Sequence, residues 1–193
     1  MKYSNICLAT NNPGKLIEIR KLLGDEFTIL SLEDIGFFQD IPETQNTIEG
    51  NSLQKARYIF DICNLNCIAD DTGLEVDALN GAPGVFSARY AGLPTDSDKN
   101  IQLLLKNLKW EENRKARFRT VITFLSHKEE IQFEGIVEGK ITLSPRGSEG
   151  FGYDSVFEPD GFEKTFGEML MAAKNQLSHR AKAIEKLIGF LRS

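Results

Sequence analysis

Residues 3–31, YSNICLATNNPGKLIEIRKLLGDEFTILS, decide the fold class of this 193-residue chain. Residues 3–9 form a short apolar run that predicts a buried first strand. Pro13 suits the first turn of a helix, and apolar residues then recur at helical spacing up to Gly24, a natural C-cap. Residues 27–31 predict a second strand. A strand, a helix and another strand in this order imply parallel pairing and an α/β fold.

The rest of the chain predicts a mixed sheet flanked by helices. Residues 116–125 and 131–137 both alternate in polarity, and their short connection makes them an antiparallel pair. The remaining elements lie between turn signals, with strands expected at 67–69 and 155–158 and helices expected from Asn46, over 97–108 and over 181–191. Neither a repeat nor a linker divides the chain, so residues 1–193 are expected to form a single domain.

Composition and charge exclude several classes of function. The net charge of −5 disfavours a long nucleic-acid groove, so no nucleic-acid polymer is expected as a partner. The chain has three cysteines, Cys7, Cys63 and Cys67. An odd number without a CxxC pair argues against a disulfide framework and against a zinc site. The Cys7 side chain is expected to be buried and to fill space in the core. The N-terminus is not typical of a signal peptide, and no segment is long enough to span a membrane. We therefore expect a cytoplasmic protein without a membrane partner.

Residues 10–15, Thr-Asn-Asn-Pro-Gly-Lys, form the turn between the first strand and the first helix. Free N–H groups and the positive end of a helix attract phosphate at such a position. Lys15 adds a cation, and Thr10 and Asn12 add hydrogen-bond donors. The spacing differs from that of a Walker A loop. The alternative is an ordinary helix N-terminus with asparagine caps and a solvated Lys15.

Asp70 and Asp71 follow the apolar run 67–69 directly, which predicts two carboxylates at the C-terminal end of a strand. Ligands usually bind at that edge of an open α/β sheet. Adjacent acids point to different sides and repel each other, so one can face a metal ion or a water molecule and act as a general base. The alternative is an Asx turn in which Gly73 supplies a positive φ. Glu43 could complete an oxygen-ligand set for Mg²⁺ with Asp71, although it is also typical of a solvated loop acid.

The segment Gly150-Phe151-Gly152-Tyr153-Asp154 places aromatic residues between glycines and beside an acid. An aromatic ring can stack on a purine, and such stacking contributes roughly 1–3 kcal/mol per base. Asp154 could accept a hydrogen bond from an N–H group of the base. The alternative is a hairpin or bulge whose aromatic residues belong to the core.

The segment Lys174 to Arg180 predicts the start of the last helix, with Ser178 as its N-cap. His179 and Arg180 then lie in the first turn, where cations are disfavoured. Their presence there indicates a specific anion or carbonyl acceptor. The alternative is a solvated pair.

Taken in order, these segments resemble the inosine triphosphate pyrophosphatase family, also called the Ham1-like or XTP/dITP pyrophosphatases. Each motif is weak by itself, but the ordered set is specific and extends from residue 9 to residue 180. The matching residues are Ala9-Thr10-Asn11-Asn12 with Lys15, Asn51, Lys55-Ala56, Ala69-Asp70-Asp71-Thr72-Gly73-Leu74, Gly81-Ala82-Pro83-Gly84, Ser87-Ala88-Arg89-Tyr90, Phe151-Gly152-Tyr153-Asp154, Lys174 and Ser178-His179-Arg180.

The resemblance implies a two-lobed α/β fold with a long mixed central β-sheet and an active-site cleft between the lobes. It also implies a homodimeric, Mg²⁺-dependent enzyme that hydrolyses deaminated purine nucleoside triphosphates (ITP, dITP, XTP) to the monophosphate and pyrophosphate, and so cleanses the nucleotide pool. Glu43 and Asp71 are then the expected metal ligands, and Asp71 is the expected base. The expected substrate-binding residues are Thr10, Asn11, Asn12, Pro13, Gly14, Lys15, Lys55, Thr72, Phe151, Gly152, Tyr153, Asp154, Lys174, His179 and Arg180.

Base selection is expected to depend on hydrogen bonds from His179 and Arg180. A 6-oxo purine presents acceptors at O6 and N7, whereas adenine presents an amino donor and would leave buried groups unpaired. This argument does not explain how GTP would be rejected. Two departures from the family pattern are Gly50, where many members have an acid, and Ser155, where a proline is common.

Two other functions stay open at this point. One is a pyrophosphatase of the septum-formation-inhibitor type, which acts on pyrimidine or modified nucleotides; the Phe151–Asp154 and Ser178–Arg180 segments favour the purine substrate instead. The other is a nucleotide-sensing or RNA-binding module without turnover. Such a module would not need Asp71 and Glu43, and the charge of this chain is wrong for RNA.

Overall fold

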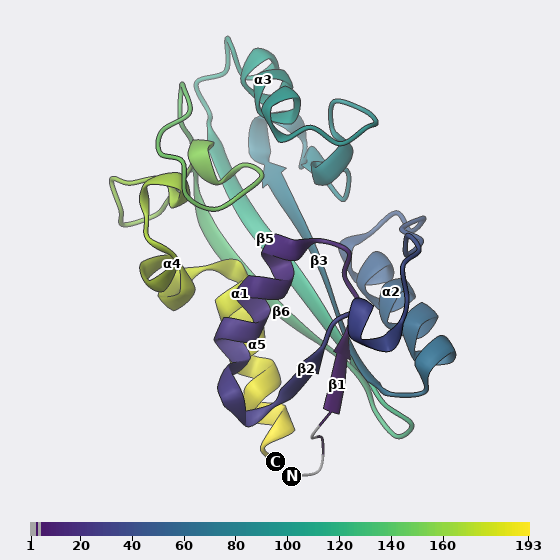
Figure 1. The fold of residues 1–193 in the computed structure, drawn as a ribbon. Coiled ribbons are helices and arrows are strands. Elements are labelled where there is room, and N and C mark those ends of the chain that lie inside the picture. Colours follow the sequence, from purple (N-terminus) through teal and green to yellow (C-terminus); the bar gives the residue numbers. More distant parts are fainter. Residues whose placement is uncertain (1–2, 4) are drawn as a thin grey trace. The chain divides into compact units, whose positions relative to one another are not determined.

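The computed structural model describes residue 3 and residues 5–193, and it contains a seven-stranded mixed sheet with helices around it (Figure 1). The strand order is β2-β1-β3-β5-β6-β7, and β4 pairs with β3. The strands are β1 (Asn5–Leu8), β2 (Thr28–Leu30), β3 (Asn66–Val76), β4 (Pro83–Gly84), β5 (Lys115–Leu125), β6 (Glu130–Ile141) and β7 (Phe157–Pro159). The helices are α1 (Pro13–Leu23), α2 (Ile48–Cys63), α3 (Ser97–Asn107), α4 (Met171–Leu177) and α5 (His179–Leu191). The expected α/β class with a mixed sheet is confirmed.

The chain divides into two compact units. Unit 1 comprises Met1–Asp71, Thr120–Gly135 and Arg180–Ser193, and unit 2 comprises Thr72–Arg119 and Ile136–His179. The long strands β3, β5 and β6 each contribute residues to both units. Each unit is described by itself below.

Unit 1 is built on three parallel strands. β1 pairs with both β2 and β3, with Cys7 opposite Leu30 on one side and Cys67 on the other. Because side chains alternate along a strand, Ile6 and Leu8 face α1 and α5, while Cys7 and its neighbour Ala9 face α2. The parallel pairing inferred from residues 3–31 is therefore confirmed, and each face of the sheet has its own apolar core.

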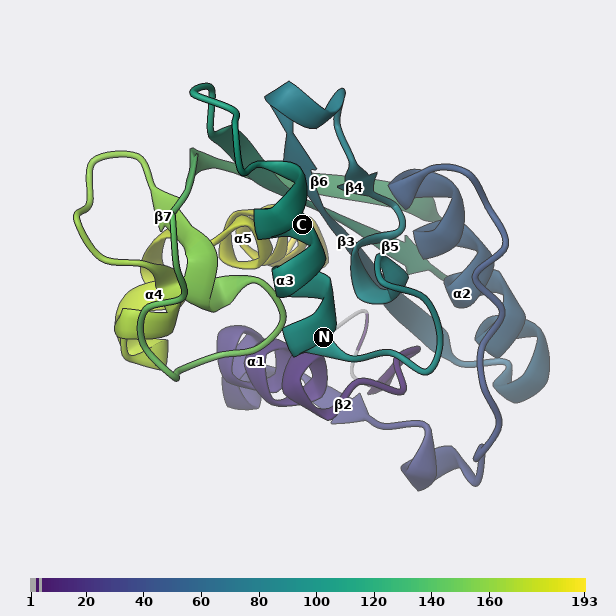
Figure 2. The same ribbon diagram turned by 90° about the horizontal axis from the view of Figure 1, so that it is seen from above.

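Unit 2 adds antiparallel pairs to the same long strands. Leu74 of β3 lies opposite Gly84 of β4, and Lys140 of β6 lies opposite Glu158 of β7. Its core is rich in aromatic and aliphatic side chains, including Leu74, Leu104, Phe118, Phe157 and Phe166. In Figure 2 the chain runs from β6 to α4 through β7 and long loops, drawn in green to yellow-green.

Four local predictions differ from the structure. The strand expected at 155–158 is observed as β7 (Phe157–Pro159), because Asp154–Val156 form a 3-10 helix. β3 does not end before Asp70 but continues to Val76, because both acids are paired where they lie within the strand. Gly73 is not among the residues with a positive φ, so the Asx-turn alternative is wrong. α2 begins one residue later than expected, with Thr47 as N-cap accepting from Gly50 N at 3.0 Å.

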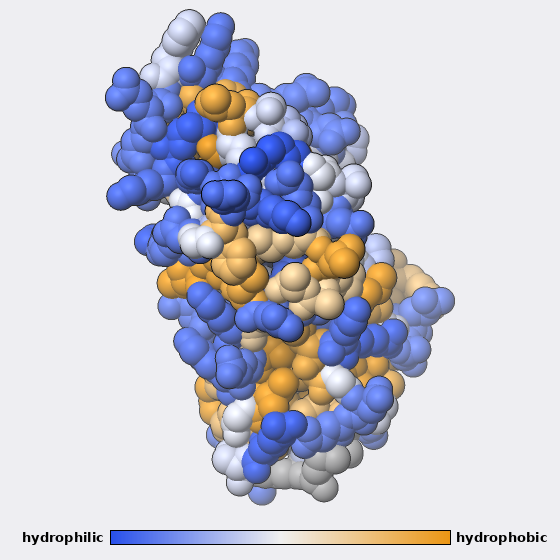
Figure 3. Space-filling view, turned by 90° about the vertical axis from the view of Figure 1, so that its left-hand side faces the viewer, coloured by the Kyte–Doolittle hydropathy of each residue, from blue (hydrophilic) through white to orange (hydrophobic). Residues whose placement is uncertain are grey.

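The surface carries apolar as well as polar residues. On the face drawn in Figure 3, hydrophobic residues are exposed beside hydrophilic ones. Large exposed apolar side chains include Trp110 (84% exposed), Leu143 (83%) and Leu170 (72%). None of the helices described here has both the length and the apolar character needed to cross a bilayer.

Candidate active site

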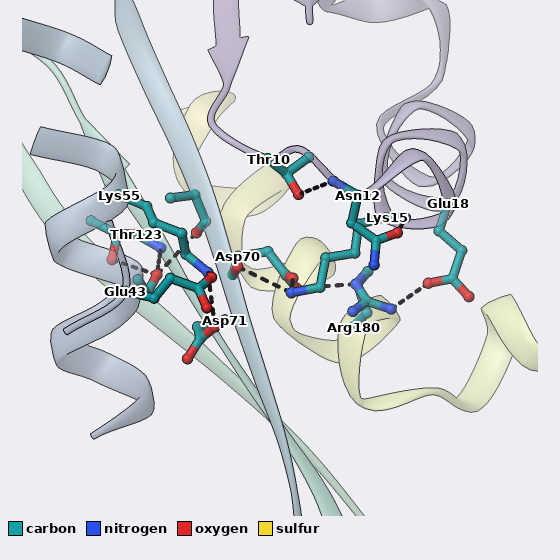
Figure 4. Close-up of polar contacts among 12 residues, drawn as sticks. Thr10, Asn12, Lys15, Glu18, Glu43, Lys55, Asp70, Asp71, Thr123 and Arg180 are labelled. Atoms are coloured by element: carbon teal, nitrogen blue, oxygen red, sulfur yellow. Dashed lines mark hydrogen bonds and ion pairs between the residues drawn. The ribbon is translucent and has the colours of Figure 1, made fainter. Parts of the chain in front are cut away.

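Asp70 and Asp71 point to opposite sides of β3 (Figure 4). The alternation of side chains along a strand requires this, since the two residues are adjacent. Asp70 faces α1 and α5, whereas Asp71 faces α2. Both are buried. Each carboxylate therefore meets a different set of charged partners.

Asp70 lies between two cations. Its carboxylate pairs with Lys15 Nζ, and its Oδ2 accepts from Arg180 Nε at 3.0 Å. Arg180 Nη1 also donates to Glu18 Oε2, and the Glu18 and Arg180 side chains are both buried. Burial opposes ionisation of Asp70, but the charges of Arg180 and Lys15 outweigh it and hold the pKa of Asp70 below its ordinary value. Asp70 is thus a charged structural partner and not a proton acceptor near neutral pH.

Asp71 shares one ammonium group with Glu43. Lys55 Nζ donates to Asp71 Oδ1 at 2.8 Å and to Glu43 Oε1 at 2.5 Å. Burial raises the pKa of Asp71, although the charge of Lys55 acts against this shift. Burial also acts to lower the pKa of Lys55, but the two carboxylates outweigh it and raise that pKa. The result is a charged lysine that holds two acids, of which Asp71 takes a proton more readily than an ordinary aspartate.

The segment that carries Glu43 is held by α2. Thr44 N donates to Gln54 Oε1 at 2.9 Å, and Gln54 Nε2 donates back to Thr44 Oγ1 at 2.8 Å. Gln45 N donates to Asn51 Oδ1 at 2.9 Å. Asn51 is buried, and its Nδ2 has no hydrogen-bond partner among the described residues. These contacts and the hydrogen bond from Lys55 all come from residues of α2, so this one helix determines the position of Glu43.

Gly50 explains why this segment can lie so close to α2. A Cβ atom at Gly50 would lie 2.8 Å from Gln45 Cβ and 3.0 Å from Thr47 Oγ1. The acid that many family members are expected to carry at this position would therefore displace Gln45. The neighbouring Glu49 contributes a backbone carbonyl to this region, which accepts from Gln132 Nε2 at 3.0 Å.

The turn before α1 combines capping with a paired lysine. Asn12 caps the helix, since its Oδ1 accepts from Lys15 N at 3.1 Å and its N–H donates to Thr10 Oγ1 at 3.2 Å. Asn11 Nδ2 donates to Gln39 O at 3.0 Å. Pro13 is the first helical residue. The capping alternative is thus correct for Asn12, but Lys15 is not a solvated side chain because it pairs with Asp70.

A second cluster of predicted residues lies in unit 2. Asp154 Oδ2 accepts from Phe151 N and from Lys174 Nζ, both at 2.8 Å. Lys174 Nζ lies 5.1 Å from the centroid of the Phe151 ring, which is within the range of a cation–π contact. The left-handed Gly150 (φ +75°) is required here, since a Cβ atom would lie 2.0 Å from Asp154 Oδ2. Phe151 remains 36% exposed and is the aromatic ring of this loop available for stacking.

Two of the expected substrate-binding residues, Tyr153 and His179, have buried rings. The Tyr153 ring belongs to the core of unit 2, and its hydroxyl donates to Ser87 O at 2.9 Å. Burial raises the pKa of Tyr153. The His179 ring is buried and stacks on Phe118 at 4.6 Å between ring centroids. The core-aromatic alternative is therefore correct for Tyr153, and the solvated-pair alternative is wrong for both His179 and Arg180.

The comparison with known families agrees with the resemblance. The family model described as "Ham1 family" matches residues 6–190.

The chain belongs to the Ham1 family.

Similar proteins of the Ham1 family cover almost all of this chain. A dITP/XTP pyrophosphatase of Flavobacterium johnsoniae is 50% identical over 186 residues, which are 96% of this chain and 97% of the relative. One of Porphyromonas gingivalis is 51% identical over 187 residues, 96% of each chain. Among solved structures, a HAM1 protein from Coxiella burnetii has a TM-score of 0.90 at 37% identity and covers 98% of both chains. The Staphylococcus aureus Ham1 protein has a TM-score of 0.88 at 38% identity, again over 98% of both chains.

The predicted residues of this Ham1 chain are divided between the two units. In unit 1 the structure brings together Glu43 with Lys55 and Asp71, and Lys15 with Arg180 through Asp70. The remaining predicted residues of unit 1 form the turn before α1, namely Thr10, Asn11, Asn12, Pro13 and Gly14. The predicted residues of unit 2 are Thr72, Phe151, Gly152, Tyr153, Asp154, Lys174 and His179.

Two residues that hold the charged side chains of the candidate site in place were missed by the sequence analysis. Glu18 follows Lys15 by three positions and precedes Leu22 by four, so helical spacing places an acid on the inward face of α1. An acid at a core-facing helical position signals a buried cationic partner. Gln54 gave no such signal, because its partner Thr44 lies in a segment without regular structure.

Proposed function

We propose that this Ham1 family chain is a Mg²⁺-dependent nucleoside-triphosphate pyrophosphatase that hydrolyses dITP, XTP and ITP to the monophosphate and pyrophosphate. The names of its relatives, dITP/XTP pyrophosphatases at about half identity over nearly the whole chain, support the substrate class. The observation that carries the proposal is the shared ammonium of Lys55 between Glu43 and Asp71. It assembles two oxygen ligands and a phosphate-binding cation at one point.

The residues present fit a magnesium ion. Mg²⁺ is usually held by one or two carboxylates together with substrate phosphates and waters, and Glu43 and Asp71 supply two carboxylates that already share one cation. Burial raises the pKa of Asp71 despite Lys55, so the site accommodates further positive charge. The buried Asn51 Nδ2, without a partner among the described residues, suits a water or phosphate oxygen as acceptor. When bound, Mg²⁺ neutralises charge on the phosphates and on the departing pyrophosphate.

In this proposal Asp71 removes a proton from the attacking water. A general base works best when its pKa approaches the working pH, and burial shifts Asp71 in that direction. Lys55 donates a hydrogen bond to Asp71 Oδ1 and so fixes the orientation of the carboxylate that accepts the proton. Asp70, whose pKa is lowered, is not suited to this role.

Lys15 and Lys55 supply the charge that binds the triphosphate. Lys15 lies in the first turn of α1, where the helix end is positive. Thr10, Asn11, Asn12, Pro13 and Gly14 shape the turn that we propose approaches the phosphates. The pairing of Lys15 with Asp70 pre-orients its ammonium group and reduces the entropy lost on binding.

The residues of unit 2 are proposed to bind the nucleoside. Phe151 offers an exposed ring for stacking, and Lys174 is fixed by Asp154. Thr72, Gly152, Tyr153 and His179 complete the proposed set, Tyr153 through its backbone since its ring is in the core. Arg180 Nε and Nη1 already bond Asp70 and Glu18, so a role in reading O6 requires the remaining donors of its guanidinium group.

Release of pyrophosphate tests the proposal directly. The purified chain is assayed with dITP, XTP, ITP, GTP, ATP and dTTP, each with Mg²⁺ and with excess EDTA. We expect pyrophosphate from the first three and little from the others, with all turnover lost in EDTA and restored by Mg²⁺. Preference for dTTP would favour the septum-formation-inhibitor type of activity. Binding of dITP without turnover would identify a nucleotide-sensing module.

We also propose that the chain forms a homodimer in the cytoplasm. Large apolar side chains such as Trp110 and Leu143 are exposed in the single chain, and an interface would remove part of this surface from water. The three cysteines are all free, as is usual in a reducing compartment. Sedimentation equilibrium gives the oligomeric state, and a monomer at micromolar concentration would contradict it.

A further inference from the structure

The three cysteines of the chain meet at one point of unit 1. Cys7 lies in β1, Cys67 in β3, and Cys63 is the last residue of α2. Their Sγ atoms all lie within 4.8 Å of one another, and none of the three forms a disulfide. The cluster faces the α2 side of the sheet, in the same apolar core as Ala56 and Ile59. It shares no residue with the proposed active site.

The parallel register produces this cluster. Cys7 and Cys67 are direct partners in the β1–β3 pair, and neighbouring strands lie about 4.8 Å apart. Both side chains therefore project from the same face of the sheet. α2 ends above them at Cys63, and Asn64 in the left-handed conformation (φ 56°) turns the chain back toward β3. Sequence spacing alone argued against a metal site, because it cannot show that residues sixty positions apart are strand partners.

The surroundings of the thiols favour a cation. The C-terminal end of a helix carries a partial negative charge, and Cys63 lies at that end of α2. Cys7 and Cys67 are fully buried, whereas Cys63 is only half-buried and is the most exposed of the three thiols.

We propose that Cys7, Cys63 and Cys67 form a three-thiolate binding site for a thiophilic d10 metal ion, either Cu⁺ or Zn²⁺. A metal–thiolate bond is about 2.3 Å long, so three sulfurs around one ion lie about 4.0 Å apart, which is compatible with Sγ atoms that all lie within 4.8 Å of one another. On binding, three S–H bonds are replaced by three metal–sulfur bonds, the protons pass to the buffer, and nothing is oxidised or reduced. The alternative is that the three thiols simply fill the core as small apolar groups.

The number of ligands distinguishes the two ions. No further His, Cys, Asp or Glu of the described chain joins the group of ligand atoms within 4.8 Å. Zn²⁺ requires a fourth ligand, which here would be a water molecule entering beside Cys63. Cu⁺ is selected by soft sulfur ligands and needs no fourth donor. Both ions therefore use the same thiolates and differ in what completes the site.

The experiment titrates the reduced, full-length chain under anaerobic conditions. One arm uses Zn²⁺ in competition with a chromophoric chelator, and Cd²⁺ as a probe whose thiolate charge-transfer band appears in the ultraviolet. The other arm uses Cu⁺ in competition with bicinchoninate. We expect one ion per chain, and the arm with the tighter binding identifies the ion. If neither arm gives a stoichiometric thiolate complex, the proposal is wrong.

Two variants separate this site from the carboxylate site. Cys63→Ser removes the half-buried ligand, is expected to preserve the fold as judged by Tm, and should weaken the affinity by at least about tenfold. Glu43→Gln, at the proposed Mg²⁺ site, should leave the Cd²⁺ band and stoichiometry unchanged. An unchanged affinity in Cys63→Ser, or loss of the band in Glu43→Gln, would overturn the assignment.

Discussion

Asp70 and Asp71 are adjacent in β3, yet their pKa values shift in opposite directions. Burial acts to raise both. Asp70 has two cations, Arg180 and Lys15, which outweigh burial. For Asp71 burial is the largest influence, and the charges of Lys55 and Lys15 do not outweigh it, while the negative charge of Glu43 adds to the rise in pKa. The alternation of a strand thus separates a permanently charged acid from one suited to exchange a proton.

Asp71→Asn is expected to remove most of the turnover and to leave the protein folded. The amide keeps the shape of the side chain but cannot accept a proton, so kcat should fall by about 10²- to 10⁴-fold. The measurement is pyrophosphate release from dITP at saturating Mg²⁺, with circular dichroism as the folding check. Near-normal kcat in a folded variant would exclude Asp71 as the base.

Asp70→Asn is expected to act on stability, because it leaves the buried Arg180 with one carboxylate fewer. Breaking a buried pair by removing one partner costs about 3–5 kcal/mol. Removing both charges in Asp70→Asn/Arg180→Met should cost less than the sum of the two single changes. Urea unfolding of the four proteins measures this coupling. Strict additivity would show that the two residues are energetically independent.

The pH dependence of activity should follow Asp71. Its pKa is raised, so the base is ionised only above that raised value, and kcat/KM should fall as pH decreases through it. Lys55 acts to lower this pKa, and Lys55→Met should therefore move the acid limb to higher pH. Profiles at constant free Mg²⁺ test the shift. A limb that moves to lower pH in Lys55→Met would contradict the proposed electrostatics.

Asp70 predicts an acid-dependent loss of stability. Its folded-state pKa lies below its unfolded-state pKa, so it stabilises the fold fully above the unfolded value, near 3.9 for aspartate. That contribution is lost as pH falls through the folded value. The pKa of Asp71 is raised on folding, so ionisation of Asp71 lowers the free energy of unfolding as pH increases. The free energy of unfolding of the wild type should therefore fall more steeply below pH 4 than that of Asp70→Asn.

Lys15→Ala should weaken catalysis on all triphosphates alike. A hydrogen bond to a charged group contributes about 1.5–3 kcal/mol, so kcat/KM should fall roughly 10- to 150-fold for dITP and for ATP. Arg180→Ala provides the contrast. If Arg180 also donates to O6, the ratio of dITP to ATP activity should shrink in that variant alone. An unchanged ratio would show that Arg180 does not read the base.

Gln54→Ala tests whether α2 positions Glu43. Gln54 binds Thr44 through two hydrogen bonds, and loss of a residue that orients a metal ligand typically costs 10- to 100-fold in metal affinity. We expect a higher Mg²⁺ requirement with kcat recovered at saturating Mg²⁺. Arg57→Ala is a matched control on the same helix, since it removes only an exposed ion pair with Glu130. An equal effect in both variants would indicate a general disturbance of α2.

The sequence was sufficient to predict elements that depend on local patterns. The parallel β1–α1–β2 unit follows from the apolar run, Pro13 and helical spacing, and the structure confirms it. The continuation of β3 through Asp70 and Asp71 was not predictable in the same way. Two buried acids are stable in this strand because Lys15, Arg180 and Lys55, which belong to distant segments of the chain, form ion pairs with them. Local propensity contains no information about such partners.

In the candidate site, too, some features follow from local motifs and others depend on tertiary packing. Ordered motifs were enough to indicate Glu43, Lys55 and Asp71, which the structure brings together. They did not indicate that the Tyr153 ring lies in the core, because an aromatic between glycines is compatible with exposure and with burial. Which of two aromatics stays exposed, here Phe151, depends on tertiary packing.

Lys15, Glu18, Asp70 and Arg180 contain two positive and two negative charges that contact one another around a buried acid. A single substitution that removes one of these four charges leaves an unbalanced charge, and selection should remove it. Changes of charge at these four positions are therefore expected only as compensating pairs of substitutions, such as a joint change at positions 18 and 180. Among diverging relatives, these positions should co-vary in sign, with the summed charge of the four kept near zero.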